Sequence, residues 1–274
     1  MSSFTHLILT RFNVRVDAAW SRAGLDPAWL EHRFGLFDRY CLPSIEAQTE
    51  RAFTWLIFFD AATPEPFRAR AEALAGRGFI RPVFLDRFDP APVSEAVRAA
   101  LTPGAARLVT TRLDNDDALS VDHVARVRDH VADQAFAFVN FDRGFVLRDG
   151  RLYEHRHPSN AFASLIEALE PGSAPRTVWS VQHMQIAGAG PVIHDQGPPA
   201  WLQIVHGRNV SNRVRGRRRR REALREGFPF AARGDGGRDS ALGVLADRAL
   251  FEPARASRDA AIALGRRLRR GLSR

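Results

Sequence analysis

The first half of the chain alternates short, uninterrupted apolar runs with longer segments whose apolar residues recur at helical spacing. Runs such as TWLIFF, residues 54–59, are bounded by polar residues, which is the pattern of a strand buried on both faces. The expected strands cover residues 6–10, 53–60, 80–85 and 106–114, and the expected helices cover residues 27–49, 64–78, 93–101 and 120–133. This alternation predicts an α/β fold with a mainly parallel central sheet flanked by helices.

Two of these helices carry boundary signals. Residues such as Leu30, Phe34 and Cys41 keep helical spacing in the first helix. Pro43 lacks the amide proton that a helix interior needs, so we expect this helix to break or restart there. Ser120 is the expected cap of the helix at residues 120–133, because a Ser hydroxyl can accept a hydrogen bond from the first turn.

The second half of the chain is richer in strands. Residues 135–156 are expected to be strand-rich with a hairpin turn at Asp149-Gly150, because Asp-Gly pairs favour tight β-turns. Further elements follow: a short helix at residues 160–169, strands at 176–186 and 200–207, and a basic amphipathic helix at 258–272.

Length and composition limit the number of domains and the class of protein that the chain can form. With 274 residues, 45% of them hydrophobic, the chain can fill a sizeable core as one large domain, with or without an appendage. No apolar run approaches the roughly 20 residues that cross a bilayer, and the first residues do not resemble a signal peptide. Cys41 is the only cysteine, which excludes an intrachain disulfide and a cysteine zinc cluster. We therefore expect a cytoplasmic protein.

Basic charge is concentrated in the C-terminal part of the chain. All 40 basic residues are Arg, a bias typical of GC-rich coding sequences, so a single Arg carries little functional information. From Gly207 onward there are 19 Arg and 7 acidic residues, whereas the preceding residues include 21 Arg and 24 acidic residues. The net charge of +9 therefore belongs to the C-terminal part, and the remainder is slightly acidic.

Acidic residues follow two of the expected strands. Asp60 ends the run FFD, and Asp114, Asp116 and Asp117 lie in the stretch LDNDDAL. Because ligands of an open parallel sheet bind outside the carboxyl ends of its strands, we expect both groups to face one crevice. Two carboxylates spaced D-x-D suit a hard divalent cation, Mg²⁺ or Mn²⁺, which would offset their mutual repulsion. The alternative is a solvated Asp/Asn turn that caps the following helix.

Several motifs resemble those of nucleotide-sugar glycosyltransferases of the GT-A fold. The segment LFDRYCLPSIEAQTERAFTWLIFFD is similar to their N-terminal helix and strand, and LDNDDAL is similar to their D-x-D motif. More narrowly, LTRFNVR, YCLPSIEAQT, TRLDNDDAL and WLQIVHGRNVSN together resemble the rhamnosyltransferase family, over residues 6–212. The resemblance implies a transferase that uses Mn²⁺ or Mg²⁺ to move a sugar, for example L-rhamnose from dTDP-rhamnose, to a glycan or lipid-linked acceptor.

The resemblance also implies roles for individual residues. Asp116 would bind the metal that bridges the two donor phosphates, with Asp117 as the rival ligand and His206 as a third. Glu167 and Asp195 are the two candidates for the carboxylate base that an inverting transferase needs at the acceptor hydroxyl. The residues expected beside the donor nucleotide and its phosphates are Thr10, Arg11, Asn13, Asp60, Arg112 and Asp114.

The expected organisation is a GT-A-like domain, 1–212, followed by an Arg-rich C-terminal extension, 213–274. Residues 1–120 would hold the donor nucleotide and 121–212 the acceptor. The run RGRRRRREALREG admits three interpretations: a solvated tail, a phosphate or nucleic-acid contact, or a peripheral contact with the anionic inner face of a membrane. Membrane contact is preferred, because acceptors of bacterial rhamnosyltransferases are often lipid-linked, and nucleic acid is not expected. The alternative functions are a nucleic-acid or anionic-surface binding protein and a non-catalytic sugar-nucleotide binder.

Overall fold

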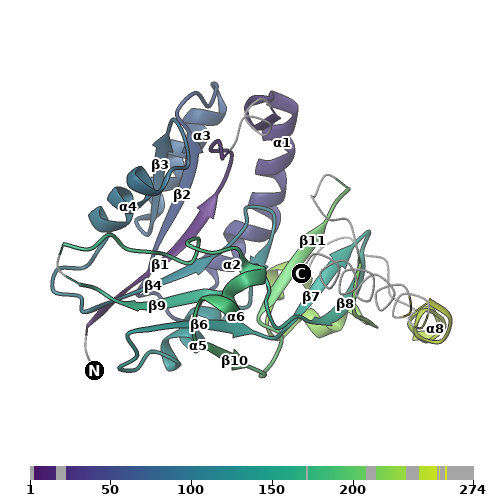
Figure 1. Cartoon of the computed structure of the whole chain (residues 1–274). Coiled ribbons are helices and arrows are strands. Elements are labelled where there is room, and N and C mark those ends of the chain that lie inside the picture. Colours follow the sequence, from purple (N-terminus) through teal and green to yellow (C-terminus); the bar gives the residue numbers. More distant parts are fainter. Residues whose placement is uncertain are drawn as a thin grey trace, which may run out of the picture.

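The strands in the described part of the chain form two sheets (Figure 1). The computed structural model describes residues 3–16, 23–170, 172–207, 214–232, 241–251, 253 and 257. The larger sheet, in the order β10-β6-β9-β4-β1-β2-β3, contains β1 (Phe4–Arg11), β2 (Thr54–Asp60), β3 (Ile80–Leu85), β4 (Arg107–Arg112), β6 (Phe136–Phe141), β9 (Ser164–Ala168) and β10 (Val192–Asp195). The smaller sheet, in the order β12-β8-β7-β11-β5, contains β5 (Ala118–Leu119), β7 (Arg143–Arg148), β8 (Arg151–Arg156), β11 (Trp201–Val205) and β12 (Arg217–Arg219).

Strand direction in the larger sheet decides where a ligand can bind. β1 pairs in parallel with both β2 and β4, β3 pairs in parallel with β2, and β10 pairs in parallel with β6. β9 is antiparallel to β4 and to β6, so β6 and β10 run in the same direction as β1. The carboxyl ends of β1, β2, β4, β6 and β10 therefore share one edge. The α/β fold with a mainly parallel central sheet is confirmed.

Helices cover both faces of the larger sheet. The helices of the described residues are α1 (Pro27–Leu36), α2 (Leu42–Glu46), α3 (Phe67–Ala73), α4 (Pro90–Ala99), α5 (His123–Asp129), α6 (Ile186–Ala189), α7 (Pro229–Ala232) and α8 (Ala241–Ala246). Of these, α7 packs against the smaller sheet. Ile8 and Phe12 of the β1 segment pack in the core cluster with residues of α1, α3 and α5, whereas Leu7 and Leu9 pack with residues of α4 and α6. This is the alternation of sides expected along a strand. The face that packs against α1, α3 and α5 is called the α5 face below, and the face that packs against α4 and α6 is called the α4 face.

The first helix restarts at Pro43, as its sequence predicts. α1 begins at Pro27, and the side chain of Asp26 caps it by accepting the backbone N–H of Trp29 at 2.8 Å. A π-helical turn at Phe37–Cys41 follows, and Pro43 lies in the first turn of α2, where its missing amide proton breaks no helical hydrogen bond.

Two predicted elements of the second half are wrong. Residues 160–169 do not form a helix; they include β9, in which Leu165 and Ile166 are buried on opposite faces of the sheet. A short apolar run fits a helix or a buried strand equally well, and only its place between β4 and β6 decides. Residues 176–186 do not form a strand: a 3₁₀ turn at His183–Gln185 leads into α6, which covers the α4 face.

One prediction of a hairpin turn is confirmed, and one prediction of a helix cap is wrong. The hairpin turn at Asp149-Gly150 is confirmed, with φ angles of 49° and 73° in the left-handed region that Gly and Asp tolerate. Ser120 does not cap α5, because Asp122 directly precedes that helix. The Ser120 hydroxyl instead donates to the Asp122 carboxylate at 2.6 Å.

The Arg run belongs to the folded body. β12 pairs antiparallel with β8, where the guanidinium of Arg218 lies 5.4 Å from the ring centroid of Tyr153 and Arg219 forms an ion pair with Glu154 at 2.9 Å. The solvated-tail interpretation is therefore wrong for β12. The domain boundary expected at 212–213 and the basic helix expected at 258–272 fall outside the described residues. Among the helices that the structure describes, none has the length and apolar character needed to span a bilayer.

Buried His6 predicts a loss of stability in mild acid. Its Nε2 lies 2.8 Å from Thr111 Oγ1, and burial, with His123 and Arg128 nearby, lowers its pKa to about 3. An unfolded His titrates near pH 6.5, so the unfolded chain binds more protons and stability falls as the pH drops below that value. We expect His6 to cost about 2 kcal/mol of unfolding free energy between pH 7.5 and pH 5.

Urea unfolding of the wild type and of His6→Gln at both pH values measures this loss. The Gln amide can replace the contact with Thr111 but does not titrate. The wild type should therefore lose about 2 kcal/mol more than the variant over this range. Equal losses in the two proteins would show that His6 does not titrate in this way.

Candidate functional site

The acidic residues after β4 form a fixed turn at the edge where the carboxyl ends of β1, β2 and β4 meet. The backbone N–H of Asp117 donates to the carbonyl of Asp114 at 3.2 Å. Asn115 holds the turn against the β1 segment by donating to the carbonyl of Phe12 at 2.9 Å. Asp116 and Asp117 are only 6% and 5% exposed, so this is not the solvated turn considered as an alternative.

Asp116 contacts two basic side chains from distant parts of the chain. Arg33 of α1 forms an ion pair with the Asp116 carboxylate and donates to Asn115 Oδ1 at 3.1 Å. His206 directly follows β11, and its Nε2 lies 2.9 Å from Asp116 Oδ2. His32, the neighbour of Arg33, places its Nε2 3.2 Å from Nδ1 of His206. The structure therefore brings the predicted metal ligands Asp116 and His206 together and adds two residues of α1.

The sequence contained a signal for Arg33 that the motif search missed. Leu30 and Phe34 define the buried face of α1, and Arg33, three residues after the first and next to the second, falls on that face. A charged residue is almost never fully buried without a partner. An Arg at such a position therefore indicates a buried acid elsewhere in the fold, here Asp116.

Asp117 is held by the backbone and lies in a buried, negatively charged environment. Its Oδ1 accepts the backbone N–H of Ile204 at 2.8 Å. Burial, together with the charges of Asp116 and Asp114, raises the pKa of Asp117 well above its usual value. The neighbouring carboxylates therefore disfavour a further negative charge on Asp117. Among the described residues, no three His, Cys, Asp or Glu side chains are grouped so as to hold a metal by themselves.

Asp114 is paired with Arg112 on the other side of the turn. Two guanidinium nitrogens of Arg112 lie 3.1–3.3 Å from the Asp114 carboxylate. Burial alone would raise the pKa of Asp114, but Arg112 and the nearby Arg11 lower it below its usual value. Arg112 also reaches Nδ1 of His183 at 3.5 Å, and burial and this Arg lower the pKa of His183 to about 4. Arg11, Arg112 and Asp114 are thus brought together as predicted.

Thr10 and Asn13 support the strand ends rather than line the crevice. Thr10 is fully buried on the α5 face, where its Oγ1 accepts the indole N–H of Trp55 at 2.9 Å. Asn13 donates to the carbonyl of Gly24 and to Thr63 Oγ1, each at 3.0 Å, and accepts the backbone N–H of Asp60 at 3.1 Å. Both side chains therefore form hydrogen bonds within the protein, whereas the sequence analysis expected them beside the donor nucleotide.

Asp60 lies at the predicted edge but faces a protein partner. Its carboxylate is fully buried, accepts the N–H of Ala62 at 2.8 Å and forms an ion pair with Arg15 Nε at 2.8 Å. Arg15 is partly exposed, so a ligand near Asp60 would meet the Arg15 guanidinium first.

The two carboxylates predicted as catalytic bases lie apart from the acidic turn. Glu167 pairs in register with Leu108 at the start of β4, the edge opposite to Asp114, and accepts the backbone N–H groups of Arg176 and Thr177 at 3.1 and 3.0 Å. It lies in β9 rather than in the predicted helix. Asp195 ends β10 at the correct edge of the sheet, three strands from β4.

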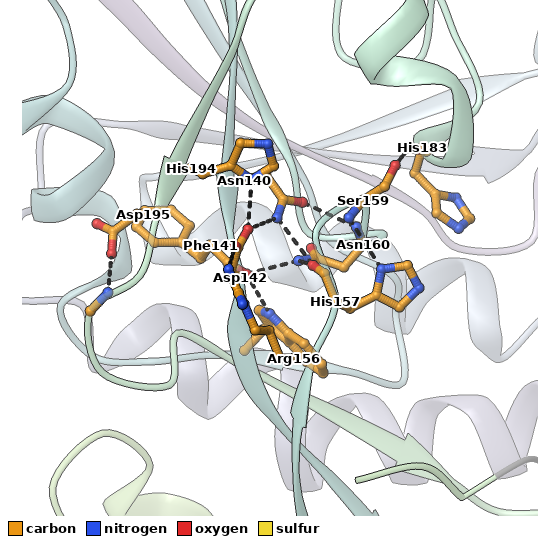
Figure 2. Close-up of polar contacts among 12 residues, drawn as sticks. Asn140, Phe141, Asp142, Arg156, His157, Ser159, Asn160, His183, His194 and Asp195 are labelled. Atoms are coloured by element: carbon orange, nitrogen blue, oxygen red, sulfur yellow. Dashed lines mark hydrogen bonds and ion pairs between the residues drawn. The ribbon is translucent and has the colours of Figure 1, made fainter. Parts of the chain in front are cut away.

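A polar cluster that the sequence analysis missed surrounds Asp142, directly after β6 (Figure 2). Asp142 Oδ1 accepts Nδ2 of Asn140 at 2.8 Å and lies 2.7 Å from Nδ1 of His194, while Oδ2 lies 3.2 Å from Arg156. The signal was present: FVNFD is an apolar run that ends on Asp, as FFD does at Asp60. The carboxyl-end edge therefore carries polar side chains at the end of β2 and β10 and directly after β1, β4 and β6.

Solved structures similar to the chain are distant in sequence. Residues 1–349 of TarS from S. aureus, in complex with UDP, share 8% identity with a TM-score of 0.43, over 74% of this chain and 60% of that one. A "putative nucleotide-diphospho-sugar transferase" from Desulfovibrio desulfuricans G20 shares 11% identity with a TM-score of 0.36, over 71% and 80%. The chain spans about 60% of the length of that TarS fragment. A search of curated proteins found no match.

The sequence comparison with families is more specific. A family model described as "Putative rhamnosyl transferase" matches residues 3–218, well over half of the chain. The match includes the acidic turn, the Asp142 cluster and His206. The chain therefore belongs to this rhamnosyl transferase family.

Proposed function

We propose that the chain transfers L-rhamnose from a dTDP-linked donor to a hydroxyl group of a glycan or lipid-linked acceptor. Membership of the rhamnosyl transferase family supports glycosyl transfer from a nucleotide-sugar donor. The observation that carries the proposal is the buried acidic turn at the carboxyl end of β4, with Arg11 and Arg112 beside it. This edge is where an open α/β sheet binds its ligands.

Arg11 and Arg112 are the residues best placed for the donor diphosphate. They lie on the same face of the sheet. Arg11 is two residues after Leu9 and Arg112 is four residues after Leu108, so each Arg shares a face with a Leu of the α4-face core. The Arg11 guanidinium lies 5.5 and 5.7 Å from the ring centroids of Phe88 and Trp179, which hold it in place. Two such guanidinium groups can bind phosphate oxygens through paired hydrogen bonds. Arg15, anchored by Asp60, would reach the nucleoside.

The acidic turn fits a divalent cation as part of the proposal. Asp116 Oδ2 and His206 Nε2 lie 2.9 Å apart and so offer one oxygen and one nitrogen donor side by side, a pair that Mn²⁺ accepts. Asp117 stays a proposed rival ligand, although its Oδ1 already binds the backbone. A bound metal would act as a Lewis acid that stabilises the departing diphosphate. Arg33 balances the Asp116 charge within the protein.

The acceptor half is proposed to lie beside the Asp142 cluster, where β6 and β10 end. A nucleic-acid role has little support in the described part of the Arg run, because Arg218 and Arg219 are occupied by contacts with β8. Peripheral contact with an anionic membrane stays a prediction that rests on the remaining Arg residues of the C-terminal extension. A non-catalytic sugar-nucleotide binder is the other outcome that the test must separate.

A thermal-shift screen of dTDP, UDP and GDP, each with and without Mn²⁺, tests the donor site. A ligand that binds only the folded state raises the free energy of unfolding by RT ln(1 + [L]/Kd), about 2.7 kcal/mol at one hundred times Kd. We expect a Mn²⁺-dependent shift with dTDP that Asp116→Asn loses. Absence of any shift would contradict the donor site, and a shift without transfer of rhamnose from dTDP-rhamnose would identify a binder.

A further inference from the structure

Strand register places His194 and Asp195 on opposite faces of the sheet. In the parallel pairing of β10 with β6, His194 lies opposite Asn140 and Asp195 opposite Phe141. Phe141 belongs to the α5-face core, whereas Phe138, two residues before Asn140, belongs to the α4-face core. His194 is therefore on the α4 face, with Arg11 and Arg112, and Asp195 is on the α5 face. Figure 2 shows the two side chains on either side of their strand.

Asp195 is used to anchor α5. Its carboxylate forms an ion pair with Arg126 at 2.7 Å, contacts His130 at 3.1 Å and accepts the backbone N–H of Gly197 at 2.8 Å. Burial would raise the pKa of Asp195, but these hydrogen bonds lower it below its usual value. A carboxylate held by three donors on the wrong face of the sheet is a poor acceptor for a substrate proton.

Asp142 and His194 form a carboxylate–histidine pair whose His lies on the α4 face, the face of Arg11 and Arg112. The backbone N–H of Asn160 donates to Asn140 Oδ1 at 3.0 Å, so the amide of Asn140 turns its Nδ2 toward Asp142. Asp142 therefore acts as an acceptor, and the proton between it and the His194 ring, 2.7 Å away, belongs to His194 Nδ1. In the neutral ring this leaves Nε2 as a proton acceptor. The His194 side chain is 39% exposed, so a substrate can reach it.

A chain of polar contacts links this pair to the donor residues. The Ser159 hydroxyl donates to the backbone carbonyl of His183, whose ring contacts Arg112 at 3.5 Å. Asn160, next to Ser159, holds Asn140 and thereby Asp142. β10 is three strand spacings from β4, about 14 Å at about 4.8 Å each, and a diphosphate with an attached sugar can bridge much of that span.

We propose that His194 Nε2 is the general base for the acceptor hydroxyl, and that Asp142 is the positioning residue that fixes the ring; this inference rests on the proposed function. His194 takes the hydroxyl proton as the acceptor oxygen forms its bond to the anomeric carbon of the donor sugar. The bond from that carbon to the phosphate oxygen breaks, and the electron pair leaves with the nucleoside diphosphate. Asp142 stays ionised and stabilises the imidazolium.

His194→Asn tests the catalytic role. Asn can keep a hydrogen bond to Asp142 through its amide nitrogen but has no basic nitrogen in the place of Nε2. We expect kcat for sugar transfer to fall about 100-fold, the lower end of a general-base contribution, with an unchanged KM for the donor and an unchanged nucleotide-induced thermal shift. His194→Gly should be restored in part by added imidazole, which a structural role would not explain. Asp142→Asn should lower kcat at least 10-fold, again without a change in donor KM.

The matched controls use the neighbouring pair on the other face. His130→Asn breaks the equivalent contact with Asp195 and should leave kcat within twofold of the wild type. Transfer by His194→Asn within threefold of the wild type, or a large loss in His130→Asn alone, would overturn the assignment in favour of Asp195. Absence of transfer by the wild type would overturn the proposed function itself, and the inference with it.

Discussion

Asp116→Asn is expected to lower the rate of sugar transfer by about 100- to 1,000-fold, the effect of removing one electrostatic stabiliser of a transition state. Asp116 lies in the acidic turn with His206 Nε2 2.9 Å from its Oδ2, so this pair is where a cation is proposed to be held against the leaving diphosphate. The Asn side chain has the same shape but cannot hold that charge. The measurement is kcat with a saturating nucleotide-sugar donor, with and without Mn²⁺.

This substitution removes the carboxylate that pairs with the buried Arg33, so we expect some loss of stability. The charge of Asp116 contributes to the raised pKa of Asp117, so its removal relieves part of the repulsion within the turn. The variant's thermal midpoint without ligand is therefore the check on folding. Asp133→Asn is the matched control, because that carboxylate is fully exposed and its ion-pair partner, Arg107, is the first residue of β4, at the end opposite to the turn. Near-normal turnover in Asp116→Asn would remove the basis for the metal assignment.

Trp201→Ala is expected to destabilise the protein by about 3–5 kcal/mol, the range for loss of a buried aromatic side chain. Trp201 is 2% exposed, stacks on Phe162 with 5.1 Å between ring centroids, and donates its indole N–H to the carbonyl of Phe141 at 2.9 Å. Gly144 lies against the indole so closely that a Cβ there would be 2.0 Å from Trp201 Cδ2. Truncation would leave a cavity between the two sheets and remove one of the two side-chain hydrogen bonds to the Phe141 carbonyl, which would keep the bond from Asn160 Nδ2 at 2.8 Å.

Chemical unfolding in urea, followed by circular dichroism, measures this loss. Leu242→Ala is the control, because Leu242 is an exposed hydrophobic residue whose truncation should change stability by less than about 0.5 kcal/mol. A loss below about 1 kcal/mol in Trp201→Ala would mean that the neighbours collapse into the space, or that the indole serves a ligand instead of the core.

The candidate site was predictable wherever a strand ends on a polar residue. Asp60 and the acidic turn were found in this way, and Asp142 could have been, because FVNFD has the same form. The interaction partners of these side chains could not be predicted from the sequence. Asp60 forms an ion pair with Arg15, Thr10 accepts a hydrogen bond from Trp55, and Asn13 donates one to Thr63. Each of these contacts joins residues 45–50 positions apart, so the sequence did not indicate them. The pairing of Asp116 with His206 likewise depends on contacts across 90 residues.

The sequence by itself determined the alternation of strands and helices in the first half, the restart at Pro43, the hairpin at Asp149-Gly150 and the position of the acidic turn. These features depend on local periodicity, on the φ angles that residues tolerate and on missing amide protons, all of which act within a few residues. Only the tertiary structure decided that residues 164–168 form a strand. The same long-range pairing decided that His194, and not its neighbour Asp195, shares a face with Arg112. A shift of one residue in the register of a strand moves every side chain to the other face, and register is set by neighbouring strands that lie far away in the sequence.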